Sequence, residues 1–530
     1  MTKRFASLFG AIAVLAALAP APVAAQPESV LRVAMTAGDI PLTAGIPDQG
    51  FEGWRFVGYS LYDALVSWDL SRSDVAADIK PGLATGWHVD PANSRRWIFE
   101  LRHGVKFHDG SPFTAADVVW NFDRFTKESA PQFNARQFAF ARGYLGSFES
   151  IEAVDEFTIA ITTKQPDSLL PYNMSFLMLV SPRRSAEVGN DADAFARNPS
   201  GTGPYRFSRM VPGERLELVK NTEYWDTARI PHHDRLVLLP MPEASTRTAA
   251  LLSGQVDWIE APAPDAIPRL RSSRMQIVTN AYPHNWAYQL NFVDGPFRDV
   301  RVRRAANYAL NRPDFKELLG GVALEAYANL PPSTPYYGHP VRYEFDPARA
   351  RALLTEAGCL PCKITLAIST SGSGQMQPLP MNELVKSQLE AAGFEVTLDV
   401  MDWNALLQVG RDGREKHQNV DGLNISRSLQ DPFNGMMRFV WTQQFAPRGS
   451  NWGHYRSEEM DALINRALAT FEPAPRLALL TQIHEKMSEE AVMLWVVHDL
   501  NPRAMSPRVR GFVQAQSWFQ DLTPITMAPR

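Results

Sequence analysis

The chain has two cysteines, Cys359 and Cys362, and their spacing is the first feature that could do chemistry. A redox-active Cys-x-x-Cys pair normally opens a helix, whose N-terminal dipole lowers the thiol pKa. This pair instead follows a predicted helix end at Gly358 and precedes an alternating apolar run at 364–368 that predicts a strand. A structural zinc site needs more ligands than two thiols. We predict a small structural disulfide, with free thiols and redox or metal chemistry as the alternatives.

Familiar catalytic motifs are missing from the sequence. It holds no G-x-S-x-G, S-x-x-K, H-E-x-x-H or H-x-x-E-H pattern. The Gly-rich run at 371–374 lacks the Lys-Ser/Thr ending of a phosphate-binding loop. His232 and His233 are neighbours on a predicted loop, so we interpret them as a solvated pair rather than as metal ligands. We expect no catalytic residue, no metal and no cofactor, and an exported hydrolase is the least favoured alternative.

Residues 96–125 hold a pattern of strand, turn and helix. Apolar residues alternate along 97–107 on both sides of a turn at His103-Gly104, which predicts a β-hairpin. Thr114 then has Asp117 three positions later, the capping-box pattern of a helix start. Apolar residues at helical spacing follow, so we predict a capped amphipathic helix.

The amino-acid sequence of this segment resembles the signature region of the extracytoplasmic solute-binding proteins of family 5. These are the dipeptide, oligopeptide and nickel receptors of ABC importers. The matching run reads W-x-F-x-L-R-x-G-V-K-F-H-D-G-x-P-F-T-A-x-D-V from Trp97 onwards. Two further stretches are similar to the family, N-P-S-G-T-G-P-Y at 198–205 and P-F-R-D-V-R-V-R at 296–303. The resemblance covers nearly all of the mature chain, and it is specific to the family but not to the ligand.

The resemblance implies an α/β bilobal periplasmic-binding-protein fold of type II, with an extra inserted sub-lobe and a ligand cleft between the lobes. The segments expected from it are a signal peptide at 1–25, lobe I at 26–58, the inserted sub-lobe at 59–181, lobe I again at 182–281, lobe II at 282–500 and lobe I once more at 501–530.

Local signals place the elements within these segments. A strand is predicted at 31–35, a helix at 54–66 and strands at 394–400 and 420–427. Further helices are predicted after Asp299, after Asp346, at 381–392, at 457–470 and at 475–490, and the arginines after Asp299 should form a solvated face. Because strands alternate with helices, we expect largely parallel sheets.

The N-terminus has the three parts of a secretory signal peptide. Lys3-Arg4 supply the positive region, 5–18 the apolar stretch, and Val23-Ala24-Ala25 the small-residue end before Gln26. We predict cleavage after Ala25 and a periplasmic protein. No cysteine follows the cleavage site, so no lipid anchor is expected.

The composition is that of an ordinary globular protein. The formal net charge is −4, and it becomes about −6 when the two basic residues of the signal peptide are lost. Nucleic-acid binders show basic patches instead, so no nucleic acid is expected as a partner. A chain of 530 residues exceeds a single core, and two or three domains are expected.

Aromatic side chains are the first candidates for lining the cleft. Trp54 lies in the approach to the first helix, Trp286 follows a lobe crossing, and Trp403 follows the strand that ends at Val400. Aromatic rings supply apolar area with few rotatable bonds, a useful property in a pocket. A buried tryptophan is more often part of a core, and that alternative stays open for each.

The segment from Arg427 to Asp431 is the second candidate. It follows a predicted strand, and ligands of α/β sheets gather beyond the carboxyl ends of strands. Peptide-binding members of the resembled family carry an aspartate three residues before an Asp-Pro pair, where it holds the α-ammonium of the peptide. Here Ser428 has that position, directly after Arg427. A serine hydroxyl cannot neutralise an ammonium, whereas arginine favours a carboxylate or phosphate.

These residues predict a periplasmic receptor of an ABC importer that binds a peptide or peptide-like solute and is not an enzyme. The alternative is a receptor for a non-peptide anionic solute, such as an opine-like conjugate, and a blocked peptide would also fit. Two other interpretations stay open: Asp431 takes over the amine, or Arg427 pairs with an acid. A chaperone or signalling receptor would share every motif. The expected partners are the solute, an inner-membrane permease and separate ATPase subunits, with the receptor as a monomer.

Overall fold

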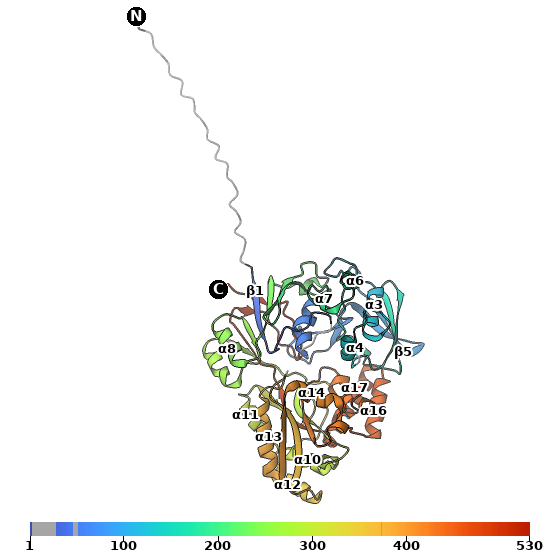
Figure 1. Ribbon diagram of the computed structural model, residues 1–530, viewed down its shortest axis with the longest axis vertical. Coiled ribbons are helices and arrows are strands. Elements are labelled where there is room, and N and C mark those ends of the chain that lie inside the picture. The colour runs from blue at the N-terminus through green and yellow to red at the C-terminus, as the bar shows by residue number, and fades with distance from the viewer. Residues whose placement is uncertain (3–27, 46–50, 142, 373, 530) are drawn as a thin grey trace.

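The computed structural model describes residues 1–2, 28–45, 51–141, 143–372 and 374–529. Nearly all of the expected signal peptide and its cleavage site lie outside these residues. The described chain forms two halves, each with its own sheet and helices (Figure 1). The first lobe holds β1, α3, α4 and α6 to α8, and the second lobe holds α10 to α14, α16 and α17 (Figure 1). We use these two names below.

The sheet of the first lobe has seven strands in the order β12-β20-β11-β1-β10-β9-β8. Its central strand, β1, is rich in apolar residues and lies parallel to β10 and β11, whereas the outer pairs are antiparallel. The strands are β1 (Val30–Met35), β8 (Tyr205–Val211), β9 (Arg215–Lys220), β10 (Arg235–Pro240), β11 (Trp258–Glu260), β12 (Gln276–Val278) and β20 (Arg503–Met505). The sheet is therefore built from three separate stretches of the chain.

The sheet of the second lobe has the order β14-β19-β13-β17-β15-β16, and β18 also pairs with β13. Its strands are β13 (His284–Leu290), β14 (Ala323–Glu325), β15 (Cys362–Ser369), β16 (Phe394–Met401), β17 (Gly422–Asn424), β18 (Arg427–Ser428) and β19 (Met493–Asp499). The chain crosses between the two sheets after β12 and again after β19. The first crossing lies between Val278 and His284, and the second lies between Asp499 and Arg503.

The prediction of largely parallel sheets is wrong. In the second lobe only β15 pairs in parallel, with β16 and β17, while β13 pairs antiparallel with β17, β18 and β19. The alternation of strands and helices did not reveal the return strands β19 and β20, which run back through the two sheets from the C-terminal part of the chain.

A third sheet is antiparallel throughout and lies within the expected inserted sub-lobe. It has the order β4-β5-β7-β6, made of β4 (Ala84–Asp90), β5 (Asn93–Leu101), β6 (Phe148–Asp155) and β7 (Thr158–Thr163). Two small sheets pair β2 (Val66–Trp68) with β3 (Ile79–Pro81), and β21 (Val509–Arg510) with β22 (Thr526–Met527). The boundaries of the expected lobe segments remain predictions.

The hairpin predicted across His103-Gly104 is wrong. β5 ends at Leu101 and pairs with β4 and β7. In the loop between β5 and α3, one isolated β-bridge joins Lys106 to Pro112. Val105 and Phe107 are buried in the sub-lobe core from a loop. The alternation of apolar residues at these positions therefore reflects their burial and does not indicate a strand pair.

The helix predicted after this loop is confirmed as α3 (Ala115–Thr126). The backbone N–H of Thr114 donates to Asp117 Oδ2 at 2.7 Å, and the reciprocal bond of the capping box is also present. The other helical elements of the first lobe are α1 (Phe51–Gly53), η1 (Trp54–Gly58), α2 (Tyr59–Leu61), α4 (Ala135–Ala141), α5 (Leu170–Asn173), α6 (Pro182–Glu187), α7 (Ala192–Ala196), η2 (Thr227–Arg229), α8 (Ala244–Leu252), η3 (Pro264–Ala266) and α9 (Ile267–Ser272).

The helix predicted at 54–66 ends at Leu61, because Tyr62 adopts an extended backbone.

The helices predicted in the second lobe are confirmed, with small differences at their ends. Asp299 caps α10 (Val300–Tyr308), Asp346 caps α12, and Gly393 ends α13 in the left-handed region. The helical elements are α10, η4 (Pro296–Arg298), α11 (Arg312–Leu318), α12 (Pro347–Glu356), α13 (Pro378–Ala392), α14 (Trp403–Asp412), η5 (Arg414–Lys416), η6 (Phe433–Met437), α15 (Arg438–Val440), η7 (Thr442–Gln444), α16 (Glu458–Leu468) and α17 (Pro473–Glu489).

Cys359 and Cys362 form a disulfide between α12 and β15, with 4.7 Å between their Cα atoms.

Two groups that were expected to be solvated are buried. His233 is fully buried, and its ring bonds Tyr205 Oη and the carbonyl of Ile525. Arg303, on the expected solvated face of α10, is 6% exposed and donates to the carbonyl oxygens of Phe297 and Glu490. In both cases, distant backbone carbonyls supply the partners that make burial possible.

Candidate ligand site between the lobes

The C-terminal tail of the first lobe touches the loop that follows β18 in the second lobe. Gln430 Oε1 accepts hydrogen bonds from Ser517 Oγ at 3.1 Å and from the backbone N–H of Trp518 at 3.2 Å. We call this contact region, residues 426–431 and 514–520, the interlobe boundary. The expected segment from Arg427 to Asp431 thus lies where the lobes meet.

The inserted sub-lobe makes a second contact with the other lobe. The backbone N–H of Ser168 donates to the carbonyl of Leu468 at 2.8 Å, and its hydroxyl donates to the carbonyl of Ala467 at 2.9 Å. The rings of Trp97 and Phe471 lie 5.7 Å apart. The two lobes are therefore in contact at two separate places.

The strand predicted at 420–427 is divided into β17 and β18. In β18, Ser428 pairs with His284 of β13, and Arg427 pairs with Asn285. Neighbouring residues of a strand point to opposite faces, and directly paired residues point to the same face. Ser428 therefore faces the same side as His284, and Arg427 faces the other. The sequence analysis placed Arg427 and Ser428 in one group, but the structure does not bring their side chains together.

Arg427 and Arg438 flank the ring of Phe439. Their guanidinium carbons lie 4.6 Å and 4.7 Å from the ring centroid. In the orientation that satisfies both of its polar atoms, the Gln289 amide accepts from Arg427 Nε at 3.1 Å. Within the described part of the chain, neither guanidinium has a carboxylate oxygen within ion-pair distance.

The charge of this arginine pair is poorly compensated. Burial lowers the pKa of Arg427 well below its usual value, and the nearby charge of Arg438 lowers it further. Burial also lowers the pKa of Arg438, against the opposing influence of Tyr144 and Asp431. Both side chains remain half-buried rather than fully buried. An anion held beside them would offset both the burial and the mutual repulsion.

Arg55 shows the contrasting case of a compensated arginine. It is almost completely buried in the first lobe, and it pairs with Glu52 at 2.9 Å and with Glu260 at 2.6 Å. Its guanidinium carbon lies 4.4 Å from the Trp518 ring centroid. The charge of Arg55 is thus balanced by protein carboxylates, and this residue stabilises the wall of the boundary.

Asp431 is occupied within its own lobe. It is completely buried, its Oδ1 accepts from the backbone N–H of Asn434 at 2.9 Å, and its Oδ2 accepts from Asn434 Nδ2 at 2.8 Å. Burial raises the pKa of this carboxyl. Through these hydrogen bonds, Asp431 stabilises the first turn of η6.

The three predicted tryptophans lie in three different clusters. Trp54 packs edge-on against Tyr144 and Phe176 in the first-lobe core, and its Nε1 donates to the carbonyl of Phe176 at 2.9 Å. Trp286 is fully buried in the core of the second lobe. Trp403 is half-buried at the start of α14, and its ring lies close enough to Gly372 to meet a Cβ there at 2.5 Å. The structure does not bring these rings together, and their contact with ligand remains a prediction.

Several residues at this site were missed in the sequence. They are Tyr144, His284, Gln430, Arg438 and Trp518. Gln430 lies inside the predicted segment but was not singled out there, and Arg438 follows the segment closely. Tyr144 and Trp518 belong to distant parts of the chain, and no local signal connects them to Arg427.

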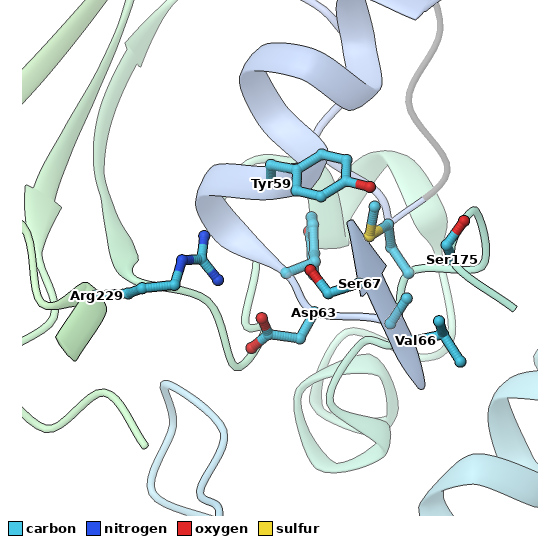
Figure 2. Close-up of a pocket in the computed structure, with 9 residues that line it drawn as sticks. Tyr59, Asp63, Val66, Ser67, Ser175 and Arg229 are labelled. Carbon is cyan, nitrogen blue, oxygen red and sulfur yellow. The ribbon is translucent and has the colours of Figure 1, made fainter. Parts of the chain in front are cut away.

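A cavity inside the first lobe is too small to be the solute site. It lies between Tyr59, Asp63 and Arg229, and Figure 2 shows their side chains around it. Its volume is about 10 Å³, which is the lower limit for one water molecule. Asp63 is already bonded by Thr202, Tyr224 and Trp225. This cavity therefore belongs to the packing of the first lobe.

No cluster of three or more His, Cys, Asp or Glu side chains in the described ranges could hold a metal ion. No helix there is both long enough and apolar enough to cross a membrane.

Two α/β lobes, joined by two crossings and touching through a polar boundary, define the class of two-lobed solute-binding receptors. Residues 78–445 match the model of the bacterial extracellular solute-binding proteins, family 5 Middle, and the chain belongs to this family. Its members are binding proteins, not enzymes. The predicted family is thereby confirmed.

Curated relatives match along most of their length. The chain is 28% identical over 462 residues to the heme-binding protein A of Haemophilus influenzae, covering 83% of this chain and 82% of that protein. It is 26% identical over 475 residues to the dipeptide-binding protein of Escherichia coli, covering 86% of each.

Solved structures confirm the mixed α/β periplasmic-binding-protein fold. The periplasmic binding protein DppA from Helicobacter pylori, in complex with the peptide STSA, superposes with a TM-score of 0.80 at 24% identity, covering 95% of this chain and 99% of that one. The protein AgaA from A.tumefacien R10, in complex with agropinic acid, gives a TM-score of 0.76 at 20% identity, covering 94% of this chain and 99% of that one.

Proposed function

We propose that this chain is the periplasmic receptor of an ABC importer, which holds a peptide or peptide-like solute with an acidic group between its lobes. The receptor acts as a monomer and passes the solute to a membrane permease, whose ATP is hydrolysed by separate subunits. Membership of a family of solute-binding proteins supports the receptor role. Two of the relatives are named for heme and for dipeptides, so the family alone does not select the solute.

The arginine pair is the observation that favours an acidic solute. Each guanidinium carbon lies within 4.7 Å of the same Phe439 centroid, so the two charges are less than roughly 10 Å apart and interact across a poorly screened interior. Arginine presents a planar fork of donors that matches a carboxylate or a phosphate. A solute with such a group would supply the negative charge that Arg427 and Arg438 do not receive from any described carboxylate.

The test begins with the solute that accompanies the protein when it is purified from the periplasm. We expect its mass after release by denaturation to reveal an acidic compound. Titration of that compound into Arg427→Ala and Arg438→Ala should show affinity reduced about tenfold to a hundredfold, because a hydrogen bond to a charged group contributes roughly 1.5–3 kcal/mol.

Arg183→Ala is the matched control. Arg183 lies exposed on the first lobe and pairs with Glu187 of α6, so its loss should leave affinity unchanged. A released solute without an acidic group would contradict the proposal. Binding of wild-type strength by both Arg427→Ala and Arg438→Ala would contradict it equally.

A further inference from the structure

We infer that His284, Ser428, Gln430 and Trp518 form a subsite at the interlobe boundary, and that this subsite binds an uncharged, oxygen-bearing group of the solute. The group is a carbonyl or a hydroxyl rather than a free ammonium. The inference rests on the proposed function, since it names a second part of the same solute. We call these four residues the neutral subsite.

The four side chains are contiguous across the boundary. His284 and Ser428 are directly paired between β13 and β18, which places their side chains on one face. The His284 ring stacks on Trp518, with 5.4 Å between centroids and 19° between planes. Gln430 is bonded to the backbone N–H of Trp518. Three of the residues thus come from the second lobe and one from the tail of the first.

Each of the four carries a buried polar atom that lacks a hydrogen-bond partner among the described residues. The atoms are His284 Nδ1, Ser428 Oγ, Gln430 Nε2 and Trp518 Nε1. The four residues are only 2%, 5%, 5% and 4% exposed. Buried polar groups in folded proteins nearly always have a partner, so four unsatisfied atoms in one cluster point to a group that arrives from outside the chain.

The chemistry of these atoms selects an acceptor. An amide N–H₂ and an indole N–H can only donate, and a hydroxyl can donate as well as accept. The orientation of the Gln430 amide is fixed, because its oxygen accepts from the backbone N–H of Trp518. Two of the four atoms are therefore obligate donors, and a solute oxygen can accept from both.

The acids of the boundary already have partners within the chain. Asp431 accepts from Asn434, and Asp499 accepts from Tyr282 and Asn501. Burial lowers the pKa of His284 to about 3, so its imidazole is neutral at physiological pH. The charge of Arg55 lies over the Trp518 ring, 4.4 Å from its centroid. A free α-ammonium would meet donors and a cation here, whereas a carbonyl or hydroxyl oxygen would be satisfied.

The position of the neutral subsite also links binding to closure. Trp518 belongs to the first lobe, and the other three residues belong to the second. One solute oxygen that accepts from both sides satisfies groups that are buried only when the lobes are together. The solute should therefore stabilise the closed form.

The test uses three defined probes on protein freed of its own solute by unfolding and refolding. The first is an equimolar mixture of dipeptides ending in glutamate, the second is the same mixture N-acetylated, and the third is gluconate with glucuronate. We expect the acetylated mixture or the sugar acids to raise the melting temperature, and these two arms distinguish a carbonyl from a hydroxyl source. The free-amine mixture should have no effect. Equal or greater stabilisation by free amines, or no shift with any probe, would overturn the inference.

Two conservative variants then test the residues with the probe that binds. Ser428→Ala removes the hydroxyl, and Trp518→Phe keeps a ring against His284 but removes the donor. Each should weaken binding about tenfold, the loss typical of one hydrogen bond to a buried partner. Trp495→Phe is the matched control, since Trp495 is fully buried with an unpartnered Nε1 among the described residues but lies in a second-lobe core cluster.

These outcomes separate the inference from the proposed function. If Ser428→Ala and Trp518→Phe bind like the wild type while Arg427→Ala does not, the neutral subsite is refuted and the acidic solute stands. If Arg427→Ala and Arg438→Ala bind normally while Ser428→Ala and Trp518→Phe lose affinity, the acidic solute is refuted and the neutral subsite stands.

Discussion

At the residue scale, Asp499 joins the two segments that cross between the lobes. Its carboxylate accepts from Tyr282 Oη at 2.9 Å and from the backbone N–H of Asn501 at 2.8 Å. Burial raises the pKa of this carboxyl from 3.8 to about 6. The acid therefore holds its proton in the folded protein at a pH where the unfolded chain has released it.

This shift gives a defined pH dependence of stability. Below about pH 4 both states are protonated and the shift has no effect. Between about pH 4 and pH 6 the unfolded chain ionises first, so the unfolding free energy falls as pH rises. The full loss is about 3 kcal/mol, since one pKa unit corresponds to about 1.4 kcal/mol.

Asp499→Asn should remove this contribution. We expect the difference in unfolding free energy, wild type minus variant, to decrease by about 3 kcal/mol between pH 4 and pH 7.5 in urea titrations. Asparagine keeps an oxygen to accept from Asn501, which limits other effects of the change. A difference that stays constant over this pH range would contradict the assigned burial of the charge.

The residues of the candidate site could be predicted only in part. Arg427 and Ser428 were found because they follow a strand and precede Asp431-Pro432. The alternation of strand side chains already placed them on opposite faces, and that signal was not used. Trp518 and Tyr144 could not be found, because they reach the site only when distant segments of the first lobe pack against the second.

At the element scale, the glycines of the 198–205 stretch allow two backbones to touch. A Cβ on Gly203 would lie 2.6 Å from the carbonyl oxygen of Ser60, and one on Gly201 would overlap the backbone of Leu61 at the end of α2. His108 of the signature segment also bonds this stretch, through its backbone N–H to the carbonyl of Gly201 at 2.8 Å. The signature segment and the 198–205 stretch thus form one packing unit in the fold.

Gly201→Ala should therefore be strongly destabilising. We expect a loss of about 3 kcal/mol or more in the unfolding free energy, because the methyl group would meet backbone that cannot move aside. Gly146→Ala is the control, since a Cβ there has no neighbour within 4 Å and the backbone is not left-handed. Equal stability of the two variants in thermal unfolding would show that the close approach at Gly201 is not rigid.

Elements set by local signals were predicted well, and elements set by distant partners were not. The capping residues Thr114, Asp299 and Asp346 each mark a helix start, because a cap acts on the backbone within three residues of itself. The false hairpin at 97–107 arose because strand partners are chosen across the sheet. The pattern of buried residues in β5 does not reveal which strands lie beside it, and these are β4 and β7.

At the scale of the whole molecule, the two-lobed fold followed from the resemblance rather than from periodicity. Alternating strands and helices suggested parallel sheets, but both sheets are mixed. In the first lobe β9 pairs antiparallel with β8 and β10, and in the second lobe β13 pairs antiparallel with β17, β18 and β19. The contacts of Gln430 with Trp518 and of Ser168 with Leu468 then hold the lobes together. These contacts join the two lobes at two places, and hinge closure is a recognised transition of two-lobed receptors.

The most direct test of this account is small-angle X-ray scattering of the receptor with and without its released solute. The ligand-free protein should be the more open form, because closure buries polar atoms of the neutral subsite without partners. At saturating solute we expect the radius of gyration to decrease and the solute to be recovered chemically unchanged. An identical radius of gyration in both samples, or a solute recovered in altered form, would contradict a receptor that binds between its lobes and closes.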